Sequence, residues 1–144
     1  MIESKIFAPA DGLKLAREVA SGLAHSHCHG IYHCDIKPRN LLWTDQGTKI
    51  IDFNVSVAVE DELSHGGGSR RYLPPDVDLS GLPTEGELGD RDLYALGITL
   101  YEVITGRYPW EAASPPPGEP ARDPRELSVL PTWPLSWSLY SSRP

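Results

Sequence analysis

No stretch of this 144-residue sequence approaches the roughly 20 consecutive apolar residues that span a bilayer. The first residues, MIESKIFAPADG, contain no apolar run of the signal-peptide kind. Only two cysteines are present, Cys28 and Cys34, which excludes the disulfide framework typical of small secreted domains. We therefore expect a cytoplasmic protein without a membrane partner.

Positively charged residues are fewer than negatively charged ones. The chain has 13 Lys and Arg against 20 Asp and Glu, a formal net charge of −7, and its basic residues are dispersed except for the pair Arg70 and Arg71. Such a balance repels a phosphate backbone, so we expect no nucleic-acid partner. The apolar fraction of 40% is typical of one globular domain, or of part of a larger one.

Proline is unevenly distributed, with eight of the 14 prolines in residues 115–144. Because proline fixes φ and removes a backbone donor, a Pro-rich segment forms neither a long helix nor a sheet ladder. We therefore predict a folded domain over residues 1–111 and an irregular Pro-rich tail over residues 112–144. Trp133 and Trp137 in this tail could alternatively form a partner-binding stretch.

Hydrophobic periodicity predicts two helices and a hairpin. Residues 12–29 have apolar side chains at helical spacing, with Asp11 and Gly30 as expected caps, and residues 92–106 have the pattern of a largely buried helix ending at Gly106. Between them, Ile31 and Tyr32 are expected to form a short buried strand, and LLWTDQGTKIIDF predicts two strands joined by a turn at residues 45–47. Residues 55–75 have no periodicity, which is typical of a functional or disordered loop.

Polar residues of a particular kind lie between these apolar runs, in the stretch IYHCDIKPRNLL. It contains Asp35, Lys37 and Asn40, and the predicted hairpin then ends at Asp52. Phosphoryl transfer needs a carboxylate that orients the acceptor hydroxyl, hard oxygen ligands for magnesium, and positive charge near the transferred group. These four residues supply each of those parts.

The same stretch resembles the catalytic loop of the protein kinase family, H-R-D-x-K-x-x-N, which residues 33–40 match at every position except the Arg. Three further motifs of the family follow in its order. The magnesium motif D-F-G is similar to DFN at residues 52–54, G-T-x-x-Y-x-A-P-E to GSRRYLPPD at residues 68–76, and D-x-W-S-L-G to DLYALG at residues 92–97. The resemblance is to the C-terminal lobe of a Ser/Thr protein kinase and covers about residues 9–111.

This resemblance implies an α+β, protein-kinase-like fold: a mainly helical C-lobe with a short β-hairpin at the active site, and without the N-lobe sheet. It implies ATP and Mg²⁺ as cofactors and a protein substrate. By position, Asp35 would be the catalytic base, Lys37 a phosphate-contacting catalytic lysine, and Asn40 and Asp52 the metal ligands. Leu42 would form the apolar floor under the adenine.

The resemblance assigns supporting roles to further residues. Ser69 matches the hydroxyl residue that seats the acceptor, and Asp92 matches the buried carboxylate that braces the catalytic loop. His33 and Phe53 match the ring pair that aligns the catalytic loop with the magnesium motif. Asp76 matches the acid that pairs with a later arginine, and we expect this partner to be missing.

Two residues differ from the family pattern, and each difference leads to an expectation. Cys34 replaces the arginine that receives a phosphorylated activation loop, so we expect any activity to be independent of such phosphorylation. Asn54 replaces the glycine of the magnesium motif, which is tolerable because Asn adopts positive φ cheaply.

The glycine-rich loop and the upstream lysine of the family are absent, because GGGSRR follows the magnesium motif rather than preceding it. The chain thus begins where the family's lower lobe begins. We expect a fragment that is inactive in isolation and that needs an N-lobe from a longer parent or another chain, since positioning supplies most of the catalysis.

Three alternatives stay open. The chain could be a non-catalytic, pseudokinase-like binding module or truncated remnant, or a small-molecule phosphotransferase, although Lys37, GSRRYLPPD and the Asp92 helix favour a protein kinase. The histidine-rich run HSHCHGIYHC could alternatively bind zinc, but neighbouring helical residues point in different directions. Its candidate ligands are His25, His27, Cys28, His29, His33 and Cys34.

Overall fold

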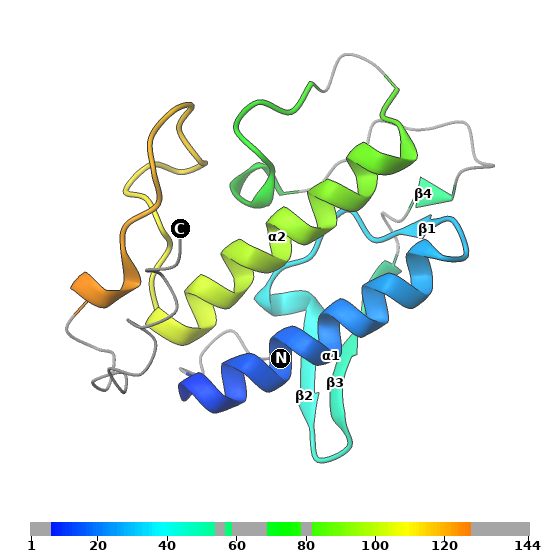
Figure 1. Cartoon of the computed structure of the whole chain (residues 1–144), viewed down its shortest axis with the longest axis horizontal. Helices are drawn as coiled ribbons and strands as arrows, with labels where there is room; N and C mark the ends of the chain where they lie inside the picture. The colour runs from blue at the N-terminus through cyan, green and yellow to red at the C-terminus, as the bar shows by residue number, and fades with distance from the viewer. Residues whose placement is uncertain (1–6, 54–56, 59–68, 79–81, 128–144) are drawn as a thin grey trace, which may run out of the picture.

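The computed structural model of the chain describes residues 7–53, 57–58, 69–78 and 82–127 (Figure 1). Two long helices, α1 (Pro9–His27) and α2 (Glu85–Thr105), lie side by side and run in opposite directions. The short strands and the loops between them lie along this helix pair. The predicted α+β class is confirmed, since the structure is a pair of long helices with a small β-hairpin beside them.

Helix α1 starts earlier than the sequence pattern predicted. It begins at Pro9 after Ala8, and Asp11 lies in its first turn instead of capping it. Proline suits this first position because its missing N–H would have no helical partner, and an acidic side chain in the first turn interacts favourably with the helix dipole. The helix ends at His27, and Gly30, with φ of +68°, completes the turn that follows.

Helix α2 begins seven residues before the predicted start at residue 92. Its N-terminus has a reciprocal capping box, in which Glu87 N–H donates to Thr84 Oγ1 at 3.3 Å and Thr84 N–H donates to Glu87 Oε2 at 2.7 Å. These bonds lower the pKa of the Glu87 carboxyl. The predicted end at Gly106 is confirmed, since this residue has φ of +70°.

One hydrophobic core joins the two helices to the loop between them. Its buried members include Leu15, Leu23 and Leu96 from the helices, together with Ile36 and Leu41, which are 0% exposed. Ile36 directly follows Asp35 and Leu41 directly follows Asn40, so the core holds the chain next to both of these polar residues.

The predicted hairpin is confirmed as β2 (Leu41–Thr44) paired antiparallel with β3 (Gly47–Ile50). It is attached to α1 through Thr48, whose N–H and hydroxyl both donate to Glu18 Oε2, at 2.8 and 2.7 Å. These bonds lower the pKa of the Glu18 carboxyl.

A second, two-residue ladder pairs β1 (Ile31–Tyr32) with β4 (Val57–Ala58). The sequence predicted β1 as buried, but only Tyr32 is, because alternate residues of a strand face opposite ways and Ile31 is 39% exposed. Strand β4 was not predicted, because two residues are too few to show a period. Asn54 and residues 59–68 of the aperiodic segment lie outside the described residues.

After α2 the chain runs along the end of that helix as irregular structure with one 3₁₀ turn, η4 (Pro124–Glu126). Trp110 Nε1 donates to the carbonyl of Glu119 at 3.1 Å, and Pro115 is buried. Residues 128–144, with Trp133 and Trp137, lie outside the described residues. Neither of the described helices has the length and apolar character that a membrane crossing requires.

Candidate functional site

The site begins at Asp92, a fully buried carboxylate on α2. Its Oδ1 accepts the backbone N–H of Cys34 at 2.7 Å and its Oδ2 accepts that of His33 at 2.9 Å. Two consecutive N–H groups can reach one carboxylate because Cys34 adopts a left-handed conformation, with φ of +64°. This conformation is costly for a residue with a Cβ, so Asp92 stabilises a strained loop backbone.

His33 links this loop to the segment that follows the hairpin. Its buried ring accepts the N–H of Asp35 at Nδ1, 3.3 Å away, so Nε2 bears the proton and donates to the carbonyl of Ile51 at 3.0 Å. The same ring meets Phe53 edge to face, with centroids 4.6 Å apart. His33 therefore fixes the position of the chain on both sides of Asp52.

Asp35 is the centre of the hydrogen-bond network. Lys37 Nζ donates to Oδ2 at 2.6 Å, and Ser69 donates both its N–H and its hydroxyl to Oδ1 at 3.1 Å. Asn40 Nδ2 donates to the carbonyl of Asp35 at 2.8 Å and to Oδ2 at 3.2 Å. The structure thus brings together four of the residues predicted from the sequence, from positions 34 residues apart.

These contacts determine the charge of Asp35. Burial raises the pKa of its carboxyl, but hydrogen bonds from Lys37 and Ser69 and the charge of Lys37 outweigh burial and lower the pKa overall. Asp35 is therefore a carboxylate at neutral pH. A carboxylate with a low pKa is a weak base, so this group is better suited to orient a hydroxyl than to remove its proton early.

Asn40 and Asp52, the two residues with oxygen ligands for a metal, are held close by the backbone. The N–H of Ile51, next to Asp52, donates to the carbonyl of Asn40 at 2.9 Å. Because the amide nitrogen of Asn40 is committed to Asp35, its Oδ1 is left as an acceptor. Asp52 is exposed and has φ of +65°, the second strained residue of the site.

Hard oxygen donors on two adjacent segments fit magnesium, which takes one or two protein side chains and completes its shell with water and phosphate. The donor set of Asn40 Oδ1 and the Asp52 carboxylate therefore fits the cofactor that the sequence predicted.

Two further predicted site residues, Leu42 and Asp76, are not members of this hydrogen-bond network. Leu42, on β2, is partly exposed, as a residue that contacts a ligand from below must be. Asp76 is exposed and makes no ion pair with any described residue, although its charge contributes to the raised pKa of Tyr94, after burial of that phenol.

Sequence reasoning considered His27 only as a candidate zinc ligand and missed its contact with Asp92. Its Nε2 lies 2.9 Å from Asp92 Oδ2, and its ring lies 4.8 Å from that of Tyr32, at the end of α1. His27 thus supports the same carboxylate that holds the backbone of His33 and Cys34. No local pattern could have found this pair, because the two residues are 65 positions apart.

A second missed group anchors the segment around the 3₁₀ turn η3 (Arg70–Tyr72). The Tyr72 hydroxyl donates to Glu102 Oε2 at 2.5 Å, and Arg71 donates to Glu102 Oε1 at 3.1 Å. The Arg71 guanidinium stacks on Tyr108, 3.9 Å from the ring centroid, and the Tyr108 hydroxyl donates to the Arg71 carbonyl at 2.6 Å. Burial raises the pKa of Tyr108 to about 12, so this phenol stays a donor.

The histidine-rich run does not converge on one point. His33 contacts Ile51, His27 contacts Asp92, and the His29 ring contacts the carbonyl of His25 at 2.8 Å. Within the part of the chain that the structure describes, which includes all six zinc candidates, no three His, Cys, Asp or Glu side chains are grouped as metal ligands.

Comparison with known proteins agrees with this geometry. The family model of the protein kinase domain matches residues 1–125. The chain is 37% identical over 111 residues to serine/threonine-protein kinase PrkC of Bacillus subtilis, which covers 74% of this chain and 16% of that protein. It is 34% identical over 120 residues to the probable serine/threonine-protein kinase PknB of Corynebacterium glutamicum, covering 78% of this chain and 18% of that protein.

A plant protein is similar as well. Serine/threonine-protein kinase GRIK2 of Arabidopsis thaliana is 40% identical over 104 residues, covering 69% of this chain and 25% of that protein. The chain therefore spans between 16% and 25% of the length of these relatives. The family match extends past residue 111, and the division of the chain at that residue stays a prediction.

Proposed function

Because the chain belongs to the protein kinase family, we propose that the loop from His33 to Asn40, together with Asp52, forms the phosphoryl-transfer site of a Ser/Thr protein kinase. The substrates would be ATP and a protein hydroxyl. The observation that carries the proposal is the convergence of Lys37, Asn40 and Ser69 on the single carboxylate of Asp35.

In this proposal Asp35 orients the acceptor. A carboxylate offers about four lone-pair positions. Four donors of this chain already contact Asp35, and the Ser69 hydroxyl is the one that can rotate away most easily. A substrate hydroxyl would take its place, with the Ser69 N–H still holding Asp35 in position. This geometry supplies the alignment on which phosphoryl transfer mainly depends.

Lys37 would act on the same hydroxyl from the other side. Its ammonium contacts both Asp35 Oδ2, at 2.6 Å, and Ser69 Oγ, at 3.1 Å, so it lies where the transferred phosphoryl group would meet the acceptor oxygen. A positive charge there stabilises the negative charge of the transferred group.

Asn40 and Asp52 would hold magnesium. When bound, the ion would neutralise charge on the nucleotide phosphates. The residues of this chain position that site beforehand, because the bonds from Ile51 to Asn40 and from His33 to Ile51 fix Asn40 and Asp52 relative to Asp35. Leu42 would lie beneath the adenine, and an N-lobe, from a longer parent or another chain, would cover the nucleotide.

A transfer assay tests the proposal. The polypeptide is incubated, alone and with a kinase N-lobe supplied in trans, with radiolabelled ATP, magnesium and a serine-containing peptide, and the Asp35→Asn variant serves as control. Transfer by the wild type and none by the variant supports the kinase reading. Nucleotide binding without transfer under any condition would favour the non-catalytic binding module.

A further inference from the structure

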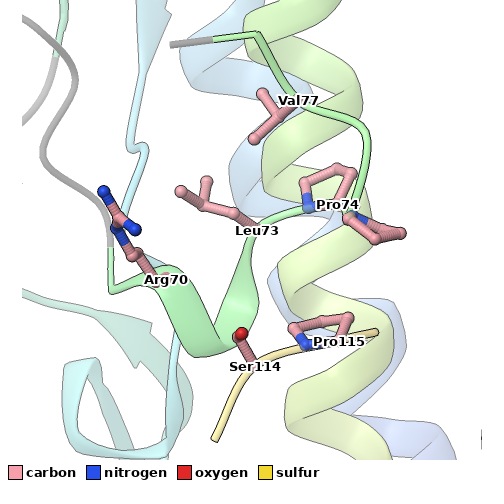
Figure 2. Close-up of a pocket in the computed structure, with 7 residues that line it drawn as sticks. Arg70, Leu73, Pro74, Val77, Ser114 and Pro115 are labelled. Atoms are coloured by element: carbon pink, nitrogen blue, oxygen red, sulfur yellow. The ribbon is translucent and has the colours of Figure 1, made fainter. Parts of the chain in front are cut away.

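Two exposed histidines lie at the C-terminal end of α1, in a part of the fold to which the proposed function gives no role. The pocket of about 240 Å³ beside η3 is a different case (Figure 2). Its lining residue Arg70 directly follows Ser69, so this pocket belongs to the proposed acceptor site. His25 lies in the last turn of α1, and His29 follows the Cys28 cap. Because both side chains are exposed, a ligand in solution can reach them.

The two imidazole rings lie next to one another. The chain is still helical at Cys28, with φ of −60° and ψ of −18°, and residues four apart on a helix share one face. The ring centroids of His25 and His29 are 4.7 Å apart, and their planes are inclined by 50°. A zinc ion lies about 2.0–2.1 Å from each imidazole nitrogen that binds it, so two rings that share one ion have centroids about 5 Å apart. The observed spacing therefore suits a shared ion.

The backbone at the helix end determines which nitrogen of His29 bears a proton. In a continued helix the carbonyl of His25 would accept the N–H of His29, but this N–H donates to the carbonyl of Ser26, at 2.9 Å. The His29 ring takes over, with Nδ1 at 2.8 Å from the carbonyl of His25. A carbonyl accepts and does not donate, so Nδ1 bears the proton and Nε2 of the neutral ring keeps its lone pair. Histidines that bind metals typically donate their other N–H to a carbonyl or carboxylate in this way.

The surroundings of the pair favour a cation. The C-terminal end of a helix carries a partial negative charge, and the chain as a whole has a formal net charge of −7. Imidazole nitrogen suits zinc and copper, whereas magnesium prefers oxygen ligands. His27, which lies between the two histidines, is engaged elsewhere, since its Nε2 is 2.9 Å from Asp92 Oδ2.

We propose that His25 and His29 form a surface site for a divalent transition-metal cation of the zinc type. Two histidines four residues apart on one helix face are a known zinc-binding arrangement. The described residues group no third His, Cys, Asp or Glu with them, so water completes the tetrahedral shell. The ion joins residues on both sides of the Cys28 cap and thereby stabilises the last turn of α1.

The experiment measures zinc binding to the whole chain by competition with a chromophoric chelator, in a buffer that contains excess magnesium and no nucleotide. We expect one zinc ion per chain. The loss of an orienting hydrogen bond alone weakens metal binding by about tenfold or more, so the loss of a ligand in His25→Asn or His29→Asn should weaken it by at least that factor. Thermal unfolding without zinc shows that the variants are folded. Zinc should raise the Tm of the wild type and not that of either variant.

Cys28→Ser is the matched control, because Cys28 is exposed and lies between the two histidines in the sequence. This variant should bind zinc as tightly as the wild type. NMR of the ring nitrogens provides a second readout, in which zinc should shift the signal of His29 Nε2 while Nδ1 keeps its proton.

Three results would overturn the proposal: unchanged zinc affinity in His29→Asn, an equal loss of affinity in Cys28→Ser, or displacement of zinc by magnesium. The last result would place the ion on oxygen ligands instead of imidazoles. Since the test uses no nucleotide and no peptide, its outcome is independent of the proposed function.

Discussion

Ser69 donates both its backbone N–H and its hydroxyl to one oxygen of Asp35, each at 3.1 Å. The same hydroxyl lies 3.1 Å from the ammonium of Lys37. A segment far along the chain therefore completes the surroundings of the Asp35 carboxylate, and substitutions at Ser69 should alter the pKa of Asp35.

Ser69→Ala should raise the pKa of the Asp35 carboxyl toward its ordinary value, because one of the hydrogen bonds that lower it is lost. Ser69→Thr keeps the hydroxyl and should leave the pKa nearly unchanged. The pKa is measured by NMR titration of the labelled carboxyl carbon. Equal values in the alanine and threonine variants would show that the hydroxyl is not a partner of Asp35.

Asp35 should also make folding stability depend on pH. Its pKa is lower in the folded state than in the unfolded chain, where it is about 3.9. Its contribution is therefore complete above the unfolded value and is lost as the pH falls through the folded value. Urea unfolding between about pH 6 and pH 3 should show a smaller loss of stability for Asp35→Asn than for the wild type. Identical pH profiles would contradict the lowered pKa.

Removing the Asp92 carboxylate should be severely destabilising. Asp92→Ala leaves the N–H groups of His33 and Cys34 buried without an acceptor, at a cost of about 2–4 kcal/mol. His27→Ala removes a partly exposed partner and should cost about 1 kcal/mol. Urea unfolding measures both, and the double variant should be less destabilised than the sum, because the two residues share one interaction. Strict additivity would mean that His27 does not support Asp92.

Two helical glycines provide a matched test of the packing between α1 and α2. A Cβ on Gly12 would lie 2.8 Å from two atoms of Ile104, whereas a Cβ on Gly97 would meet nothing within 4 Å. Gly12→Ala should therefore cost about 1 kcal/mol or more by overpacking, despite its better helix propensity. Gly97→Ala should stabilise by up to about 1 kcal/mol. Thermal unfolding that gives both variants the same sign would contradict the observed helix contact.

Features of the fold that depend on residues close together in the sequence could be predicted, and those that depend on distant residues could not. The hairpin and the end of α2 at Gly106 were predictable, because turn residues and glycine act locally. The start of α2 was not predicted, because Leu88 is the one large apolar residue between Glu85 and Asp92, too few to show a helical period. The signal that would have found it is the Thr84 to Glu87 capping box.

The residues of the site also fall into a group that a local motif predicts and a group that it does not. Asp35, Lys37 and Asn40 lie within six residues and could be predicted together from one motif. The partners that hold them were harder to find, since His27 and Asp92 come from different helices and Arg71 and Glu102 from segments 31 residues apart. Such pairs depend on how the helices pack, which no local pattern encodes.

The most direct test of the proposed site is a thermal-shift titration of the chain with ATP, with and without magnesium, on the wild type and on Asp52→Ala. A ligand that binds only the folded state at a hundredfold excess over its Kd stabilises it by about 2.7 kcal/mol, which is several degrees in Tm. The account predicts a magnesium-dependent rise in the wild type that Asp52→Ala abolishes. An equal rise in both proteins, or none in the wild type, would contradict the assignment of Asn40 and Asp52 as the magnesium–nucleotide site.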